Sequence, residues 1–210
     1  MKRVFLTAAL SLSLLFPSLS VAKERFIIDY FNNFKTLEAD FNQIVKSKQS
    51  SETSSGHLKL QKPEGESLKP KFVFDYKKPY AQLLMSNGEK LWHYDVDLMQ
   101  VVIKPTKELE NNPLLMVLLG DRTLDQSFTI QTVSNGQSYI LFPKNPQDGL
   151  EILSIDVNFK GKKLHSFVAK DLTGQTVTFE LQRVQENRPL EASSFEFRAP
   201  KDVDVIDETR

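Results

Sequence analysis

Histidines and paired carboxylates are the side chains of this chain that could do acid–base or metal chemistry. His57, His93 and His165 lie far apart in the sequence, and none has a metal-ligating residue at helical ligand spacing. Asp95 and Asp97 form an Asp-x-Asp pair, which is typical of a solvated turn at the end of a strand. We therefore expect surface or strand residues at these positions and no catalytic or metal site.

Other chemical signatures are absent from the sequence. It has no cysteine, which excludes disulfides, thiol catalysis and cysteine-ligated metals. It has neither a glycine-rich phosphate loop nor a Gly-x-Ser-x-Gly elbow. Its 27 basic and 27 acidic residues balance, so there is no electrostatic case for binding nucleic acid. The sequence predicts neither an enzyme nor a bound cofactor.

The first residues predict export. Met1–Arg3 is a short basic segment, Val4–Phe16 is an apolar run, and Ser20 and Ala22 form a small-x-small cleavage site. The alternative is an uncleaved anchor, but the apolar run is shorter than the roughly 20 residues that span a membrane. We expect a cleaved signal peptide over residues 1–22. A single domain over residues 23–210 then follows, and the leading segment is typical of a bacterial Sec substrate.

Two helices are predicted. The first covers Lys23–Phe34, where apolar residues recur at helical spacing and form one stripe: Phe26, Ile27, Tyr30, Phe31 and Phe34. The second is short, because Asn112 can cap it, Pro113 suits its first turn and Gly120 suits its end. This second helix is apolar nearly all round, so we expect another part of the protein to cover it.

Most of the remaining chain alternates apolar and polar residues with the period of a strand. We predict strands over residues 36–47, 57–61, 71–76, 80–86, 90–103, 125–132, 137–143, 150–159, 164–171, 176–185 and 194–197. Asn87-Gly88 is a hairpin signal, and the Ser-rich stretch 50–55 is predicted to be a turn. About ten short strands in succession favour a single antiparallel sheet that curls.

A curled sheet has a concave face, and the two apolar helices are expected to close over it. The chain has 15 phenylalanines, whose rings must be buried somewhere. Two interpretations remain open from the residues alone. The concave face is either the wall of a filled hydrophobic core or the wall of an apolar pocket with a helical lid.

Five motifs follow one another along the chain: Phe41-Asn42-Gln43, the segment Gly56–Pro63, the strand Lys71–Tyr76, the block Ser86–Asp95 and the ending Phe195–Asp207. This ordered set resembles the periplasmic outer-membrane lipoprotein carrier family of the Lol pathway. The corresponding family segments read Phe-x-Gln, Gly-x-Leu-x-x-x-Arg-Pro, Phe-x-Trp-x-Tyr, Ser-Asp-Gly-Lys-x-Leu-Trp-x-Tyr-Asp and Phe-x-Phe-x-Pro-Pro-x-Gly-Val-Asp-Val. The match covers nearly the whole chain that follows the signal peptide.

The resemblance implies a mainly β (α+β) fold: an incomplete, strongly curved antiparallel β-barrel with a helical lid over an apolar cavity. It implies a monomeric chaperone without a cofactor, located in the periplasm of a Gram-negative bacterium. Such a protein takes lipoprotein cargo from an inner-membrane ABC transporter and passes it to an outer-membrane receptor. The residues expected to contact the acyl chains are Ile27, Phe31, Phe41, Phe72, Phe74, Tyr76, Trp92, Tyr94, Leu115, Met116, Leu118 and Leu119.

This chain departs from the family pattern in three places. The strand tryptophan is Phe74 here, and residues 64–71 look inserted. The family's arginine before proline is a lysine: Lys62 in an ungapped alignment, or Lys69 if the gap is placed earlier. Either lysine is the candidate latch that would hold the lid.

Other functions fit parts of the sequence. The outer-membrane receptor of the same pathway has a similar fold, but it is a lipoprotein and needs a cysteine that this chain lacks. A lipoprotein-sensing regulatory domain normally needs a membrane tether or a second domain. A periplasmic lipid or glycolipid shuttle has no sequence feature that separates it from a lipoprotein carrier.

Overall fold

The computed structural model describes residues 19–63, 69–106, 113–119, 123–133, 136–144 and 152–209. The side chains of residues 19–23, 113, 114 and 116 lie outside the described part as well. Most of the expected signal peptide, most of the inserted segment 64–71 and the side chain of Met116 therefore fall outside it. None of the described helices is long and apolar enough to cross a membrane.

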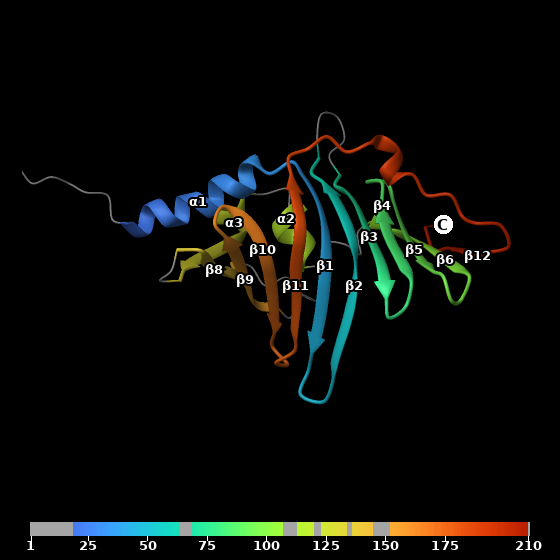
Figure 1. The fold of residues 1–210 in the computed structure, drawn as a ribbon, viewed down its shortest axis with the longest axis horizontal. Coiled ribbons are helices and arrows are strands. Elements are labelled where there is room, and N and C mark those ends of the chain that lie inside the picture. The colour runs from blue at the N-terminus through green and yellow to red at the C-terminus, as the bar shows by residue number, and fades with distance from the viewer. Residues whose placement is uncertain are drawn as a thin grey trace, which may run out of the picture.

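The described strands form one twelve-stranded sheet that does not close on itself (Figure 1). Its order is β12-β6-β5-β4-β3-β2-β1-β11-β10-β9-β8-β7, and every pair is antiparallel except β12–β6. The strands are β1 Thr36–Lys46, β2 Ser51–Gln61, β3 Lys71–Lys78, β4 Gln82–Ser86, β5 Lys90–Asp95, β6 Gln100–Pro105, β7 Phe128–Thr132, β8 Ser138–Pro143, β9 Ile152–Lys160, β10 Lys163–Asp171, β11 Thr176–Glu186 and β12 Asp204–Asp207. The prediction of a mainly β, open antiparallel sheet is confirmed.

Few helices accompany the sheet. The helices whose full length lies in the described residues are α1 Leu19–Asn33, α2 Pro113–Leu119, α3 Leu124–Ser127 and the 3₁₀ helix η2 Ala192–Phe195. In Figure 1, α2 lies behind β11 and β1, on the inner side of the sheet. Both predicted helices are present, although α1 begins four residues before its predicted start at Lys23.

Three local predictions were wrong. The Ser-rich stretch 50–55 belongs mostly to β2, because each residue from Ser51 onward pairs with β1 and pairing overrides the turn preference of serine. The stretch 90–103 is two strands, β5 and β6, because the Asp95 carboxylate accepts a hydrogen bond from Leu98 N at 3.0 Å and closes a turn. Residues 125–127 belong to α3 rather than to a strand.

The C-terminal prediction was also wrong in part. Residues 192–195 form η2 instead of a strand, and the tail adds β12 parallel to β6. The backbone carries this return: Asp204 N donates to Met99 O at 2.9 Å, and Glu208 N donates to Ile103 O at 2.9 Å. This strand is only four residues long, with two apolar residues between two aspartates, so it carries too little periodicity to be predicted.

The main hydrophobic core lies on the inner face of the sheet. It joins side chains of α1, α2 and α3 to strands from β5 towards one edge of the sheet to β7 at the other edge. Ile27, Leu37, Leu58, Leu60, Phe72, Leu118, Leu141 and Val157 have no exposed surface. This single apolar cluster positions the candidate site.

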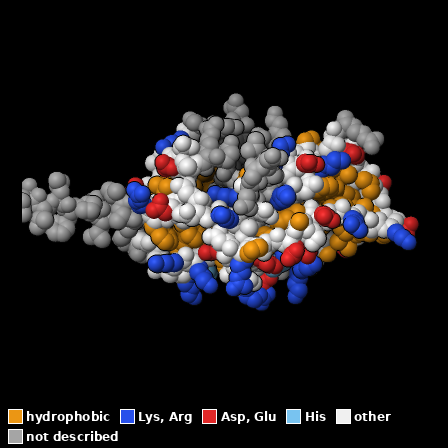
Figure 2. Space-filling model, turned by 90° about the horizontal axis from the view of Figure 1, so that it is seen from above, with side chains coloured by type: hydrophobic (Ala, Val, Ile, Leu, Met, Phe, Trp, Pro, Cys, Tyr) orange, Lys and Arg blue, Asp and Glu red, His pale blue; other side chains and the backbone are white. Residues whose placement is uncertain are grey.

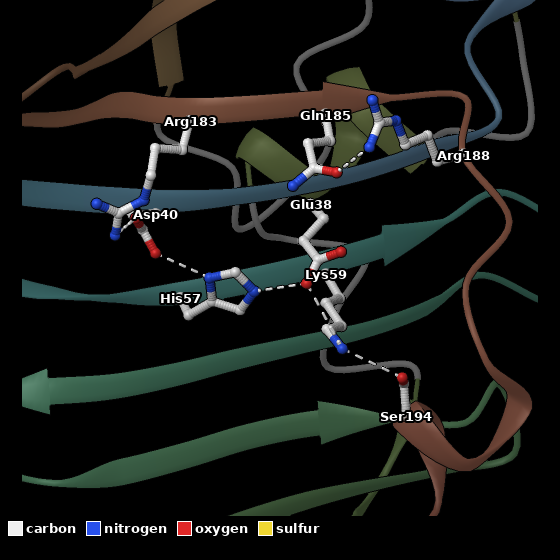
Figure 3. A network of polar contacts seen from close by, with 8 residues as sticks. All are labelled: Glu38, Asp40, His57, Lys59, Arg183, Gln185, Arg188 and Ser194. Atoms are coloured by element: carbon white, nitrogen blue, oxygen red, sulfur yellow. Dashed lines mark hydrogen bonds and ion pairs between the residues drawn. The ribbon is translucent and has the colours of Figure 1, made fainter.

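The outer face of β1 and β2 is polar (Figure 3). His57 lies between two carboxylates, with Nδ1 2.9 Å from Asp40 Oδ1 and Nε2 3.0 Å from Glu38 Oε1. Arg183 forms an ion pair with Asp40, while Lys59 approaches Glu38 and donates to Ser194 Oγ at 3.3 Å. The last bond ties η2 to β2. Seen from above in Figure 2, Lys and Arg side chains line the lower long side of the molecule, with Asp and Glu side chains among them.

Candidate functional site

Aromatic rings from three strands form a wall on the inner face. Phe41 of β1, Phe74 of β3 and Phe179 of β11 lie with ring centroids 5.8 to 6.2 Å apart. Phe72 and Tyr76 extend the wall along β3, with centroids 5.8 and 6.5 Å from that of Phe74. They share one face because strand side chains alternate with period two. All five belong to the main core or pack against it.

Gly56 allows the wall to pass over β2, which lies between β1 and β3. This glycine pairs with Phe41 on one side and Tyr76 on the other. A Cβ added here would stand 2.9 Å from Phe41 Cζ and 2.2 Å from the Asp75 carbonyl oxygen. Without that Cβ, the Tyr76 ring lies edge-on against the Phe41 ring with centroids 5.0 Å apart. The glycine therefore matters for close approach.

Helix α1 covers part of the inner face with its apolar stripe. Ile27 is fully buried and Phe31 nearly so. Phe26 and Tyr30 pack edge-on against Phe159 of β9, with centroids 5.2 and 4.9 Å away. Burial, the hydrogen bond to Glu186 and its negative charge all raise the pKa of Tyr30 far above its usual value. The helix is thus held by apolar packing and by that bond, in which Tyr30 OH donates to Glu186 Oε1 at 2.6 Å.

Helix α2 is buried along the part whose side chains are described. Leu115, Val117, Leu118 and Leu119 all belong to the main core. The expectation that another part of the protein covers this helix is confirmed for these four residues. Val117 lines a small pocket together with Phe31, so the two helices adjoin there.

Lys62, one of the two latch candidates, lines the same small pocket as Phe31 and Val117. Its Nζ donates a hydrogen bond to the Phe31 carbonyl oxygen of α1 at 2.6 Å and stands 5.9 Å from the centroid of the Phe34 ring. Burial lowers the pKa of its ammonium group. Lys69, the other candidate, is exposed, and its backbone lies beside Gly88 in the β4–β5 turn. The geometry therefore favours Lys62.

Trp92 and Tyr94 do not join the other candidate residues, which corrects the sequence-based assignment. Directly paired residues of neighbouring strands point to the same face, and Trp92 pairs with Met85 whereas Phe74 pairs with Leu84. Trp92 and Tyr94 thus lie on the outer face, where both rings pack on Phe197, with centroids 6.0 and 6.1 Å away. The motif prediction failed because a motif match does not say which face of a strand a ring occupies.

Several core residues were missed by the motif-based list. They come mainly from the second half of the sheet, namely Tyr139, Phe159, Phe167 and Phe179, and from the partly exposed Tyr30 of α1. Their apolar alternation in the predicted strands was the signal that could have found them. Among the residues with described positions, no group of three His, Cys, Asp or Glu side chains could hold a metal ion.

Comparison with known proteins shows which family the chain belongs to. The model of the family described as outer membrane lipoprotein carrier protein LolA matches residues 32–198. The chain belongs to this family. An outer-membrane lipoprotein carrier protein of Methylobacillus flagellatus is 30% identical over 184 residues, which cover 85% of this chain and 86% of that protein. The one from Methylococcus capsulatus is 32% identical over 184 residues, with 85% of each chain covered.

A solved structure supports the fold alone. An uncharacterized conserved protein from Thermus thermophilus superposes with a TM-score of 0.52 at 13% identity, covering 90% of this chain and 99% of that one. Membership of the LolA family makes this chain a lipoprotein carrier and not an enzyme, and proteins of this family are periplasmic.

Proposed function

We propose that this carrier shields the acyl chains of lipoproteins between the aromatic wall of its sheet and the helices α1 and α2. The residues we assign to the acyl site are Ile27, Phe31, Phe41, Phe72, Phe74, Tyr76, Leu115, Leu118 and Leu119, with Met116 carried over from the sequence. The observation that supports the proposal is the single apolar cluster that joins both helices to the wall.

Apolar contact suits this task energetically. Each methylene group removed from water contributes about 0.8 kcal/mol, so lipid chains exposed to an aqueous compartment would cost many kcal/mol. Contacts without directional hydrogen bonds let the chains enter and leave in several positions. A carrier of this kind must bury the chains and still release them to the next protein.

Cargo cannot enter the described conformation unless part of the protein moves. Phe72 and Phe74 are at most 2% exposed, so the wall is filled by the protein's own side chains. We infer that α1 and α2 move away from the wall when cargo enters. The Lys62 to Phe31 hydrogen bond would then hold the cargo-free, closed form.

The partners and the compartment follow from the family. We propose that the chain is exported with cleavage after Ala22 and acts as a periplasmic monomer. It would receive cargo from an inner-membrane ABC transporter and deliver it to an outer-membrane receptor. N-terminal sequencing of the periplasmic protein should start at Lys23, and Met1 retained in the membrane fraction would contradict this part.

The cargo class can be tested directly. The protein should be purified from the periplasm, and its bound molecules should be identified by mass spectrometry. Lipid-modified proteins or their acylated N-terminal peptides are the expected result. Free phospholipid or glycolipid as the main bound species would favour the shuttle, which is the alternative function.

A further inference from the structure

The inner face of the sheet changes from apolar to polar along β3, β4 and β5. One row of paired residues is Phe72, Ser86 and Leu91, and the next is Phe74, Leu84 and His93. The third row is Tyr76, Gln82 and Asp95, which continues to Gln100 of β6. Phe72 and Phe74 are buried, whereas all four residues of the third row are half-buried. The third row therefore combines polar side chains with partial access to water.

A hydrogen bond crosses the sheet at the boundary. Tyr76 OH donates to Gln43 Oε1 at 2.7 Å, although β2 separates their strands. The bond is possible because Gly56, between them, has no side chain to block the tyrosine ring. Gln43 lies two residues after Phe41 on the same face of β1, so the pair sits directly beside the aromatic wall.

This polar boundary keeps unused hydrogen-bond donors. The amide oxygen of Gln43 accepts the bond from Tyr76, and its amide nitrogen makes no hydrogen bond to another described residue. Gln82 Nε2 donates one hydrogen to Asp95 Oδ2 at 3.1 Å and has a second. Asp95 is different, since its other oxygen already accepts from Leu98 N in the turn. The donors of Gln43 and Gln82 thus remain for a ligand, while Asp95 is structural.

We propose that Gln43, positioned by Tyr76 and supported by Gln82, binds the carbonyl groups at which the acyl chains join the modified N-terminus of the cargo. This inference rests on the proposed acyl site. Ester and amide carbonyls accept hydrogen bonds, and leaving them unpaired next to an apolar wall is unfavourable. Donors at the end of that wall satisfy these carbonyls while the chains pack on Phe74 and Phe41. The pair would therefore favour an acylated peptide over a bare hydrocarbon and set how far its chains enter.

Two probes separate this role from plain apolar binding. One is a synthetic peptide whose N-terminal cysteine carries a dipalmitoylglyceryl thioether, and the other is a pyrene-labelled alkane that has no carbonyl group. Binding of each is measured for the wild type, Gln43→Met, Tyr76→Phe and Asn42→Ala. Asn42 is the matched control because it is the neighbour of Gln43 on the opposite face of β1. Thermal melting establishes that each variant is folded.

We expect Gln43→Met and Tyr76→Phe to weaken lipopeptide binding by about two- to tenfold, as for one net hydrogen bond. Alkane binding to Gln43→Met should not change, and Asn42→Ala should affect neither probe. An equal loss for both probes, or no loss for the lipopeptide, would overturn the polar anchor and leave the acyl site intact. A wild-type protein that binds neither probe would overturn the acyl site and the anchor together.

Discussion

Lys62 Nζ donates a hydrogen bond to the backbone carbonyl of Phe31 and so joins the end of β2 to α1, with 2.6 Å between the two atoms. The same Phe31 side chain is buried in the core under α1. Because the acceptor is a backbone atom in the last turn of a helix, one cation holds the helix in place without specifying a side chain. We expect this hydrogen bond to stabilise the closed, cargo-free form relative to the open form.

Replacing Lys62 with leucine should weaken the closed form. Amides in the last turn of α1 should exchange hydrogen for deuterium faster, because that turn loses the cation bound to its carbonyl. The variant should still take up lipoprotein but pass it to the receptor more slowly, since the cargo-free form that drives release is less stable. Lys69→Leu is the control and should behave as the wild type. A handover defect seen only in Lys69→Leu would move the latch to that residue.

The wall is tested by placing a carboxylate at Phe74. A buried carboxylate without a partner costs several kcal/mol, so Phe74→Glu should melt at a lower temperature. We expect it to stay folded because opening of α1 and α2 lets the charge reach water, and we expect it to lose binding of an acyl probe. Val73→Glu, on the outer face of β3, should keep binding. An unfolded Phe74→Glu would indicate core packing alone at this position, and normal binding would remove Phe74 from the site.

The sequence predicted the parts of this fold that local pattern controls. Alternation located most strands, and the stripe around Ile27 located α1. It could not show that β12 returns beside β6 or that Ser51 continues a strand, because both depend on pairing with distant residues. The same limit explains the error at Trp92: the motif identified an aromatic residue, but only register with β4 shows which face the ring occupies. The motif alone made Lys62 a candidate latch. The contact between Gln43 and Tyr76 could not be predicted without knowing the order of the strands.

The phenol of Tyr76 should lose its proton at a higher pH than an ordinary tyrosine does. Burial raises its pKa from 10.0 to about 12, so the folded state keeps the phenol proton at pH values where the unfolded chain loses it. This contribution to stability is present below the ordinary pKa and is lost as pH rises from about 10 towards 12. The difference in tyrosinate absorbance between the wild type and Tyr76→Phe should show a midpoint near the higher value. A midpoint near the ordinary value would mean that the phenol is already open to water.

Glu38 should contribute to the loss of stability as the pH falls into the acid range. Burial alone would raise the pKa of Glu38, but the hydrogen bond from His57 and the charges of Lys59 and His57 together lower it below 4.5. A carboxylate with a lowered folded pKa stabilises the protein above its unfolded pKa, and this stabilisation is lost as pH falls through the folded value. Glu38→Gln should therefore show a flatter decline of melting temperature in acid than the wild type. Glu52→Gln, at an exposed position of β2, is the control, and an identical flattening there would contradict the role of Glu38.

The packing of Trp92 and Tyr94 on Phe197 can be observed through Trp92, which is the one tryptophan of the chain. Its ring packs on Phe197, and both rings lie across the sheet from the acyl site. Replacing Phe197 with alanine should expose the indole and shift its emission to longer wavelength. Binding of an acyl probe should remain at the wild-type level, because Phe74 and Phe41 on the inner face keep their contacts. Ile103→Ala is a useful companion, since Ile103 pairs with Trp92 on the same face and should give a smaller shift. If Phe197→Ala abolished acyl binding while its melting temperature was unchanged, Trp92 and its neighbours would belong to the cargo site after all.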